Sequence, residues 1–251
     1  MNIAIIFAGG TGQRCKTGNN IPKQFVEVLG KPIIIHTLDI FQNHPQIDKI
    51  YIAIHPDYID FMQNLVNKHD ITKVCGITKG GATGQESIFN ALSLAIKENE
   101  TTDTVLIHDG VRPILDDEVI SKNIESVKKH GNAITCTNCH ETILVSINGL
   151  TPVHVPFRNN TYTAQAPQSF RLGEIFDAHL SLQENRQDPY ENMIDSCTIY
   201  DYLGLKTYMV QGNRGNIKIT TQEDLHILKA LIEHRREEKE KNIIGITNAI
   251  N

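Results

Sequence analysis

The sequence predicts an α/β protein with a mostly parallel sheet and helices on both faces. Short apolar runs alternate with amphipathic segments through roughly the first 140 residues, which is typical of βαβ units. A glycine-rich turn directly follows the first apolar run, where a parallel strand commonly leads into a ligand-binding loop. The chain of 251 residues is long enough to bury one large core.

Each apolar run is expected to form one buried strand, with an amphipathic helix before the next run. The expected strands cover residues 3–7, 49–54, 73–78, 104–107 and 133–137. The expected helices cover residues 32–43, 58–68, 85–97 and 117–129. Each helix carries apolar residues at helical spacing, as Ile88, Ala91, Leu92 and Ala95 do in the third.

The alternation breaks at about residues 140–163, where the sequence predicts a protruding β-hairpin arm. Residues 141–146 and 151–156 flank Asn148-Gly149, a pair that favours a tight hairpin turn. Because two strands alone are marginally stable, we expect the arm to pack against a second subunit. The alternative is a hairpin folded back on its own domain.

The remaining elements complete a single expected domain over residues 1–251. A short polar loop at 165–168 should lead into a helix at 172–181, followed by strands at 206–210 and 216–220. Thr221 is expected to cap a last helix, with Asp224 three residues further on. That helix should continue into a charged, solvated helix end, which together with a tail covers about residues 233–251.

Composition favours a small-molecule partner. The formal net charge of -5 argues against a nucleic-acid surface, which normally carries a basic stripe. No apolar run approaches membrane-spanning length, and no export signal follows Met1, so we expect no membrane partner. Five scattered cysteines fit a reducing compartment, which predicts a cytoplasmic location.

The glycine-rich turn at residues 8–14 is the first candidate site. Glycines let backbone N–H groups approach phosphate oxygens, and Arg14 and Lys23 supply positive charge beside them. The turn lacks the third glycine of the dinucleotide fingerprint, because Cys15 stands in that position. The later loop at 80–87 lacks the Gly-Lys pair of a phosphate loop. The turn therefore favours a triphosphate ligand outside those two motif classes.

Two further loops follow expected strands and should meet the first turn at the carboxyl edge of the sheet. Asp109 ends a buried apolar run, so it is a candidate ligand for magnesium or a ribose. The alternatives are a turn residue for Asp109 and a salt-bridge partner for Arg112. Lys218 stands inside a short apolar run, which is an unusual place for an unpaired lysine.

Taken together, these residues resemble the cytidylyltransferases that act on 2-C-methyl-D-erythritol 4-phosphate and on D-ribitol 5-phosphate. The resemblance runs from the first strand to about residue 232. It rests on six blocks in the same order: 8–14 with Pro22-Lys23-Gln24, 80–87, 108–113, Arg158, 165–168 and 216–218. It implies a Rossmann-like nucleotidyltransferase sheet and a homodimer formed through the β-arm.

The resemblance also implies a role for each matching residue. The catalytic cations would be Arg14, Lys23, Arg158 and Lys218. CTP would contact Ala8, Gly9, Gly10, Thr11, Gly12, Gly81, Ala82, Ser87, Asp109, Gly110 and Arg112. The polyol phosphate would contact Thr142, Arg158, Asp195 and Lys218, and Asp109 would hold Mg²⁺. Arg158 would serve the neighbouring subunit's site.

The implied reaction moves CMP from CTP to a polyol phosphate and releases pyrophosphate. D-ribitol 5-phosphate is the expected acceptor, and the isoprenoid-pathway acceptor 2-C-methyl-D-erythritol 4-phosphate is the alternative. A nucleotide-binding regulator without catalysis is a second alternative, because of Gly84 and Gly215, two of three positions at which the chain departs from the family pattern. Gly84 replaces an arginine, Gly215 replaces an acidic residue, and Ile194 replaces the threonine before Asp195.

Overall fold

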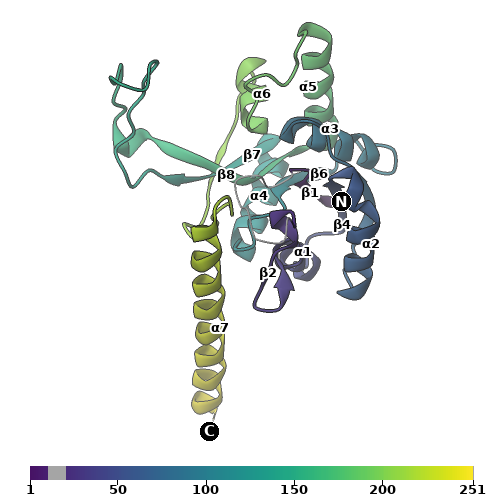
Figure 1. The fold of residues 1–251 in the computed structure, drawn as a ribbon, viewed down its shortest axis with the longest axis vertical. Coiled ribbons are helices and arrows are strands. Elements are labelled where there is room, and N and C mark those ends of the chain that lie inside the picture. The colour runs from purple at the N-terminus through teal and green to yellow at the C-terminus, as the bar shows by residue number, and fades with distance from the viewer. Residues whose placement is uncertain (11–20, 251) are drawn as a thin grey trace.

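A seven-stranded sheet forms the centre of the molecule (Figure 1). The computed structural model describes residues 1–10 and 21–250. The strand order is β5-β4-β1-β6-β8-β7-β9. The strands are β1 (Asn2–Ala8), β4 (Lys49–Ile54), β5 (Val74–Lys79), β6 (Thr104–Asp109), β7 (Asn132–Asn138), β8 (Tyr162–Arg171) and β9 (Met209–Gln211). A small antiparallel pair, β2 (Glu27–Val28) and β3 (Lys31–Pro32), lies outside this sheet.

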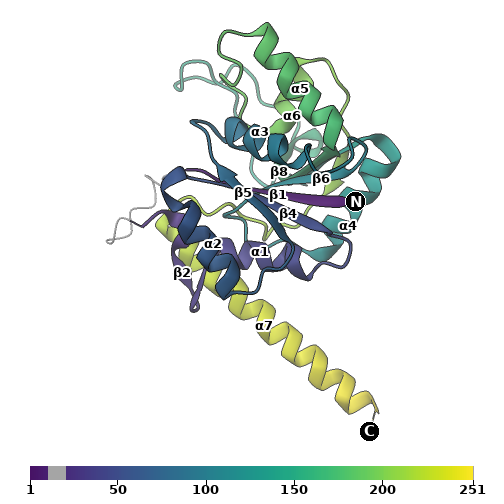
Figure 2. The same cartoon turned by 90° about the vertical axis from the view of Figure 1, so that its right-hand side faces the viewer.

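Helices cover both faces of the sheet (Figure 2). The α-helices are α1 (Ile33–Asn43), α2 (Ile59–Lys68), α3 (Gly84–Ala95), α4 (Asp117–His130), α5 (Leu172–Asn185), α6 (Ser196–Tyr202) and α7 (Gln222–Ile250). Three short 3₁₀ segments are η1 (Lys23–Phe25), η2 (Pro56–Tyr58) and η3 (Arg158–Asn160). The mixed, mostly parallel sheet with two helical layers confirms the predicted fold class.

Alternation along β1 builds the two halves of the core. Ala4 and Ile6 pack with α1, α2 and α4 on one face, while Ile3 and Ile5 pack with α3, α5 and α6 on the other. All four side chains have no exposed area. Because β1 is buried on both faces and pairs in parallel with β4 and β6, the carboxyl ends of all three strands meet at one edge.

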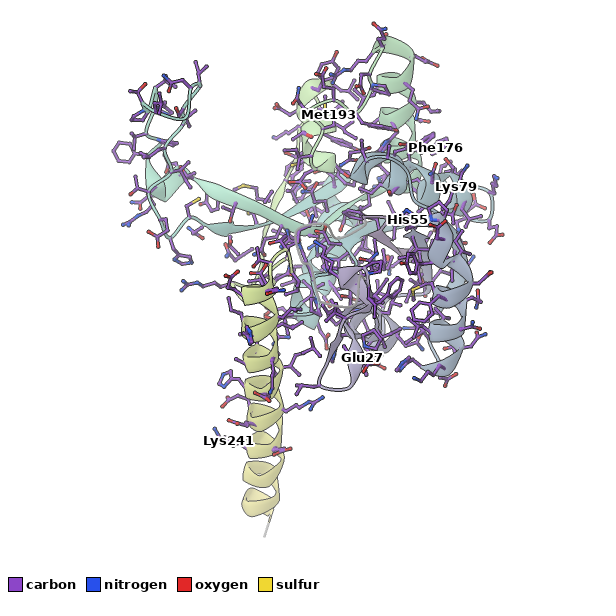
Figure 3. All side chains as sticks on the ribbon, in the orientation of Figure 1. Glu27, His55, Lys79, Phe176, Met193 and Lys241 are labelled. Atoms are coloured by element: carbon purple, nitrogen blue, oxygen red, sulfur yellow. The ribbon has the colours of Figure 1, made fainter. Side chains whose placement is uncertain are left out.

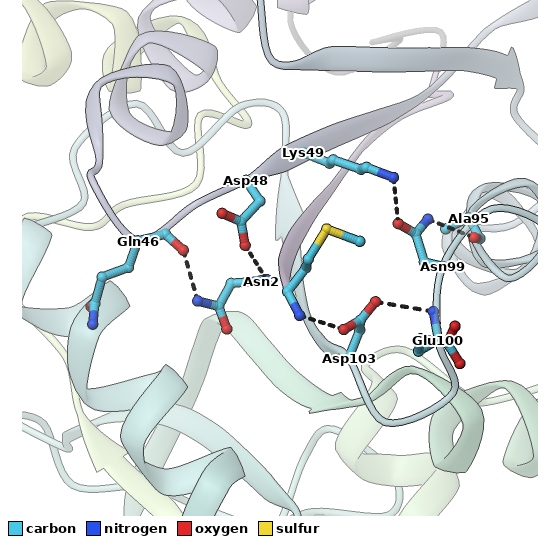
Figure 4. A network of polar contacts seen from close by, with 9 residues as sticks. Asn2, Gln46, Asp48, Lys49, Ala95, Asn99, Glu100 and Asp103 are labelled. Carbon is cyan, nitrogen blue, oxygen red and sulfur yellow. Dashed lines mark hydrogen bonds and ion pairs between the residues drawn. The ribbon is translucent and has the colours of Figure 1, made fainter.

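A network of polar side chains holds the opposite, amino edge of the sheet (Figure 4). Asp48 accepts a 2.7 Å hydrogen bond from the Asn2 backbone N–H, which joins the start of β1 to the residue before β4. Lys49 donates at 2.8 Å to Asn99, whose amide donates at 2.7 Å to the Ala95 carbonyl at the end of α3. These contacts fix the strand starts, so the loops at the other edge are held at defined positions.

The longest strand, β8, was not predicted. Residues 165–168, which were expected to form a loop, lie inside this ten-residue strand. It runs antiparallel to both β6 and β7, and its register with β7 shifts between Ile134 and Cys136. A proline at residue 167 argued against a central strand, but the irregular pairing accommodates it.

A buried polar network joins β8 to α4 and β7. The Asn123 amide donates to the Val119 carbonyl and to Thr135 Oγ1, both at 2.9 Å. Its carbonyl oxygen accepts from Ser169 Oγ at 2.9 Å. Asn123, Thr135 and Ser169 have no exposed area, so each side chain depends on the others for hydrogen bonds.

The expected arm leaves the body between β7 and β8 (Figure 1). The described structure assigns no strands to residues 141–146 or 151–156, and one isolated antiparallel bridge joins Val145 to His154. The expectation of two full strands in the arm is therefore not met. Asn148 still forms the expected turn, accepting hydrogen bonds from the Leu150 and Thr151 N–H groups.

The last part of the chain differs from the expectation in two strands. The strand expected at 206–210 is shorter and shifted, since β9 covers Met209–Gln211. Residues 216–220 form no strand, although the Ile219 N–H donates at 2.9 Å to the Val111 carbonyl. That segment is held by contacts with the site loops rather than by sheet pairing.

The final helix α7 begins directly after Thr221 and runs to Ile250. Its start is fixed by Asp224, whose carboxylate accepts hydrogen bonds from the Thr220 and Thr221 N–H groups at 2.7 and 2.8 Å. Figure 3 shows Lys241 on the part of α7 that projects beyond the sheet. Among the described residues, no helix is long and apolar enough to cross a membrane.

We expect Asn123→Ala to lower the free energy of unfolding by about 1–3 kcal/mol, because it leaves Thr135 and Ser169 buried without their partner. Urea denaturation would measure the change. The matched control is Asn185→Ala, which removes an exposed hydrogen bond to the Ser181 carbonyl. Equal stability of the two variants would contradict the role assigned to the buried network.

Candidate active site

A cavity of about 300 Å³ opens at the carboxyl edge of the sheet. It lies where parallel α/β sheets commonly bind ligands, between the loops that follow β1, β5 and β6. Its lining residues come from those loops, from η1, from the start of α3 and from the segment before α7. They are Phe7, Ala8, Gly9, Gly10, Lys23, Gln24, Gly81, Ala82, Thr83, Gly84, Ser87, Asp109, Val111 and Lys218.

Two glycine loops form one wall of this cavity and touch each other. A Cβ placed on Gly9 would lie 2.7 Å from Ser87 Oγ and 3.3 Å from the Gly80 Cα, so only glycine fits this approach. Ser87 Oγ accepts a 3.0 Å hydrogen bond from the Gly81 N–H and donates at 2.9 Å to the Thr83 carbonyl. Ser87 therefore fixes the second loop against the first.

The second loop ends at the N-terminus of α3. Thr83 is the N-cap, and its Oγ1 accepts a 3.0 Å hydrogen bond from the Glu86 N–H. The Glu86 carboxylate accepts from the Ala82 N–H at 2.7 Å. Gly84 is exposed, and a Cβ there would lie 3.7 Å from the Phe7 ring, so space remains beside it. A helix N-terminus at the cavity favours an anionic ligand.

Gln24 connects the segment of Lys23 to the first glycine loop. Its amide donates to the carbonyls of Ala8 and Gly10 at 2.9 and 3.1 Å. The side chain is almost fully buried, and the backbone around it forms η1. Gln24 was not identified as a functional residue from the sequence, although it adjoins Lys23 in the matching block. Lys23 and the glycines thereby line the same cavity.

Asp109 lines the cavity and forms ion pairs with two cations. Its Oδ1 lies 2.6 Å from Lys218 Nζ, and its Oδ2 lies 2.7 Å from Arg112 Nε. Burial raises the pKa of the Asp109 carboxyl, but the charges of Lys218 and Arg112 outweigh this and hold the pKa below its ordinary value. Asp109 is therefore ionised at neutral pH.

The buried side chain of His108 holds the turn after β6 in place. Its Nε2 lies 3.1 Å from the Arg112 carbonyl and therefore donates, while its ring packs on Phe41. Burial lowers the pKa of His108 to about 4, so the ring is neutral at physiological pH. His108 adds no charge beside Asp109 and shapes the turn through one hydrogen bond.

The segment that carries Lys218 is positioned by Asn216 rather than by a strand. Arg112 Nη1 donates at 2.8 Å to the Asn216 carbonyl, and the Asn216 amide donates at 2.6 Å to the Ala166 carbonyl in β8. Asn216 has no exposed area. The turn after β6, the unpredicted strand β8 and Lys218 are thus one connected assembly.

Several expected site residues lie elsewhere or outside the described structure. Thr11, Gly12 and Arg14 lie outside the described residues. Thr142 and Arg158 are exposed on the arm, and a single chain does not bring them into the cavity. Gly110 is not among the residues that line the cavity, and its N–H donates a 3.0 Å hydrogen bond to the Phe7 carbonyl at the end of β1.

Asp195 and two of the three departures from the family pattern can also be placed. Asp195 lies with Asp109 beside a second, smaller cavity, and burial followed by the charge of Asp109 raises its carboxyl pKa. Ile194 lines the same small cavity, although most of the residue is exposed. A Cβ on Gly215 would lie 3.3 Å from Ile114, so that position is tighter than the one at Gly84.

Solved structures with the same fold cover almost the whole chain. The 4-diphosphocytidyl-2C-methyl-D-erythritol synthase of Anaerococcus prevotii matches 92% of this chain and 96% of its own, with a TM-score of 0.77 and 28% identity. The Francisella tularensis 2-C-methyl-D-erythritol 4-phosphate cytidylyltransferase matches 90% and 96%, with a TM-score of 0.73 and 30% identity.

Sequence relatives include both acceptor classes. A ribitol-5-phosphate cytidylyltransferase of Streptococcus agalactiae is 42% identical over 240 residues, covering 95% of this chain and 98% of that protein. One from Vibrio parahaemolyticus is 43% identical over 233 residues, covering 93% and 96%. The 2-C-methyl-D-erythritol 4-phosphate cytidylyltransferase of Clostridium acetobutylicum is 35% identical over 237 residues, covering 93% and 98%.

The family model described as 2-C-methyl-D-erythritol 4-phosphate cytidylyltransferase matches residues 2–234. That match includes every strand and the whole cavity lining described above. It agrees with the three sequence relatives and with the Francisella tularensis structure, all of which are cytidylyltransferases by name. The chain therefore belongs to the 2-C-methyl-D-erythritol 4-phosphate cytidylyltransferase family of enzymes.

Proposed function

We propose that this protein transfers CMP from CTP to D-ribitol 5-phosphate, forming CDP-ribitol and pyrophosphate. The observation that carries the proposal is one cavity lined by two glycine loops, Lys23, Lys218 and Asp109. The choice of acceptor is supported by ribitol-5-phosphate cytidylyltransferases at 42% and 43% identity, against 35% for the Clostridium acetobutylicum relative with the other acceptor.

In the proposed reaction, a phosphate oxygen of the acceptor forms a bond to the α-phosphorus of CTP. The bond between that phosphorus and the bridging oxygen breaks, and pyrophosphate leaves with the electron pair. A phosphate nucleophile is ionised near neutral pH, so no general base is required. Lys23 and Lys218 would align the two anions and neutralise charge in the transition state.

The proposed reaction includes Mg²⁺, and Asp109 is the residue in the cavity that would bind it, together with substrate phosphates. The described residues contain no cluster of three or more His, Cys, Asp or Glu that could hold a metal ion. Mg²⁺ is commonly held by one or two carboxylates together with substrate phosphates and water. Asp109 lines the cavity with one carboxylate, and among the described residues each of its oxygens makes one ion pair, which leaves a second lone pair on each for an ion. Bound there, the ion would neutralise phosphate charge.

The arm supports a proposed homodimer in which Thr142 and Arg158 of one chain serve the other chain's acceptor. Both residues are exposed in the described chain. Large apolar side chains are exposed with them, including Ile147, Leu150 and Phe157. Such a cluster is typical of a surface that packs against a partner.

The four described cysteines are free thiols, which agrees with the proposed cytoplasmic location.

The acceptor can be tested by measuring pyrophosphate release from CTP and Mg²⁺ with D-ribitol 5-phosphate and with 2-C-methyl-D-erythritol 4-phosphate. We expect kcat/KM to be at least tenfold higher with the ribitol substrate, because the more similar relatives use it by name. A reversed preference would assign the alternative acceptor. Release with neither, while CTP still raises the melting temperature, would favour a nucleotide-binding regulator.

Lys23→Ala and Lys218→Ala are each expected to lower kcat by roughly a hundredfold or more, because one preorganised charge in a cavity typically contributes that much. Steady-state pyrophosphate release would measure the loss. The matched control is Lys128→Ala, an exposed residue of α4, which should retain full activity. Wild-type turnover in both cavity variants would exclude the mechanism.

Asp109→Asn should raise the Mg²⁺ concentration for half-maximal activity by at least about tenfold, a loss typical of altered metal surroundings. A magnesium titration of initial rates at saturating CTP would measure it. Asp116→Asn is the control, since Asp116 pairs with Arg235 away from the cavity. An unchanged magnesium dependence in Asp109→Asn would remove Asp109 from the metal site.

A further inference from the structure

A second cavity, of about 20 Å³, lies next to the large one. The two cavities share Phe7 and Asp109, so the small one adjoins the proposed reaction centre. A space of this size holds one water molecule or one hydroxyl group and excludes a phosphate. Its other walls come from α3, β6, β8 and the residues that lead into α6.

Three residues that line this cavity carry buried polar atoms without a hydrogen-bond partner in the described structure. They are Gln85 Oε1, from the first turn of α3, Gln165 Oε1, from β8, and Ser196 Oγ, from the first residue of α6. Gln85 is 1% exposed and Ser196 is 2% exposed. Because buried polar atoms are nearly always hydrogen-bonded in native proteins, three such atoms beside one small space indicate a polar ligand there, and Gln85 and Ser196 are the two whose side chains are almost fully buried.

The orientation of Gln85 is fixed, which defines the chemistry of that ligand. The Gln85 amide nitrogen donates at 3.3 Å to the Ile194 carbonyl, and the carbonyl oxygen Oε1 is then available only as an acceptor. Ser196 Oγ can donate its proton. A single hydroxyl group would donate to Gln85 and accept from Ser196, whereas a methyl group or a phosphate oxygen would leave Gln85 unpaired.

We propose that Gln85 and Ser196 bind one hydroxyl group of the acceptor's polyol chain and that Gln85 thereby determines acceptor specificity. This inference rests on the proposed function, because it assigns part of the acceptor to the same site. Asp195, on the wall of the cavity, adds a further acceptor, and Ile88 and Ala166 enclose the space with apolar surface. A site that binds a substrate hydroxyl strongly rejects analogues that lack it.

Gln85→Met tests the proposal because it keeps the length of the side chain and removes its hydrogen-bond acceptor. We expect kcat/KM for D-ribitol 5-phosphate to fall by about tenfold to a hundredfold, while KM for CTP changes less than about twofold. The preference over 2-C-methyl-D-erythritol 4-phosphate should fall by a similar factor. The control is Gln63→Met, which alters an exposed glutamine of α2.

Monodeoxy analogues of D-ribitol 5-phosphate distinguish a substrate hydroxyl from a bound water. One analogue should lack the hydroxyl that contacts Gln85. With that analogue, the kcat/KM of the wild type should fall as far as the kcat/KM of Gln85→Met falls with the full substrate. The kcat/KM of Gln85→Met should fall little further when the full substrate is replaced by that analogue. Equal losses in wild type and Gln85→Met for every analogue would mean that the cavity holds only water and would overturn the proposal. Ser196→Ala gives the same comparison if Gln85→Met does not fold, which the CTP-induced melting shift would reveal.

The same assays separate this inference from the proposed function. If the wild type uses only 2-C-methyl-D-erythritol 4-phosphate, the proposed acceptor is wrong, and Gln85 is then tested with monodeoxy analogues of that substrate. Loss of one hydroxyl contact in that series would support the inference despite the change of acceptor. Turnover of neither acceptor would overturn both proposals.

Discussion

The ion pairs of Asp109 with Lys218 and Arg112 are the interaction on which the cavity depends. They join the end of a buried strand to a segment more than one hundred residues further along the chain. Without them, a buried carboxylate would stand unpaired, which is strongly unfavourable in a protein interior. The pairing therefore requires residues 216–219 to lie beside the turn after β6, although no sheet pairing holds them there.

The rest of the architecture brings those charges to a single edge. Parallel pairing of β1 with β4 and β6 aligns their carboxyl ends, and the polar network around Asn2 and Lys49 holds their starts. Strand β8 then provides the carbonyl of Ala166 that orients Asn216. The positions of the side chains that line the cavity thus depend on contacts between distant segments of the chain as much as on the loops that carry them.

Much of this could be predicted because local sequence patterns determine it. The apolar run before Gly9 and the run ending at Asp109 identified two strands and the loops after them. Strand β8 was missed because Pro167 and its polar neighbours are typical of a loop, and only antiparallel pairing to β6 and β7 stabilises the extended form. Gln24 and Gln85 were missed because their burial follows from tertiary contacts that no spacing encodes.

The close contact between Gly9 and Gly80 has a dynamic consequence. A Cβ placed on Gly80 would lie only 2.9 Å from the Gly9 Cα, so the two loops touch through their main chains, with the short Ser87 side chain packed beside the contact. Main-chain atoms in contact cannot shift by changing rotamer, so displacement of one loop must displace the other. The wall of the cavity formed by these loops is therefore expected to move as one rigid unit, and a ligand held by either loop restrains both.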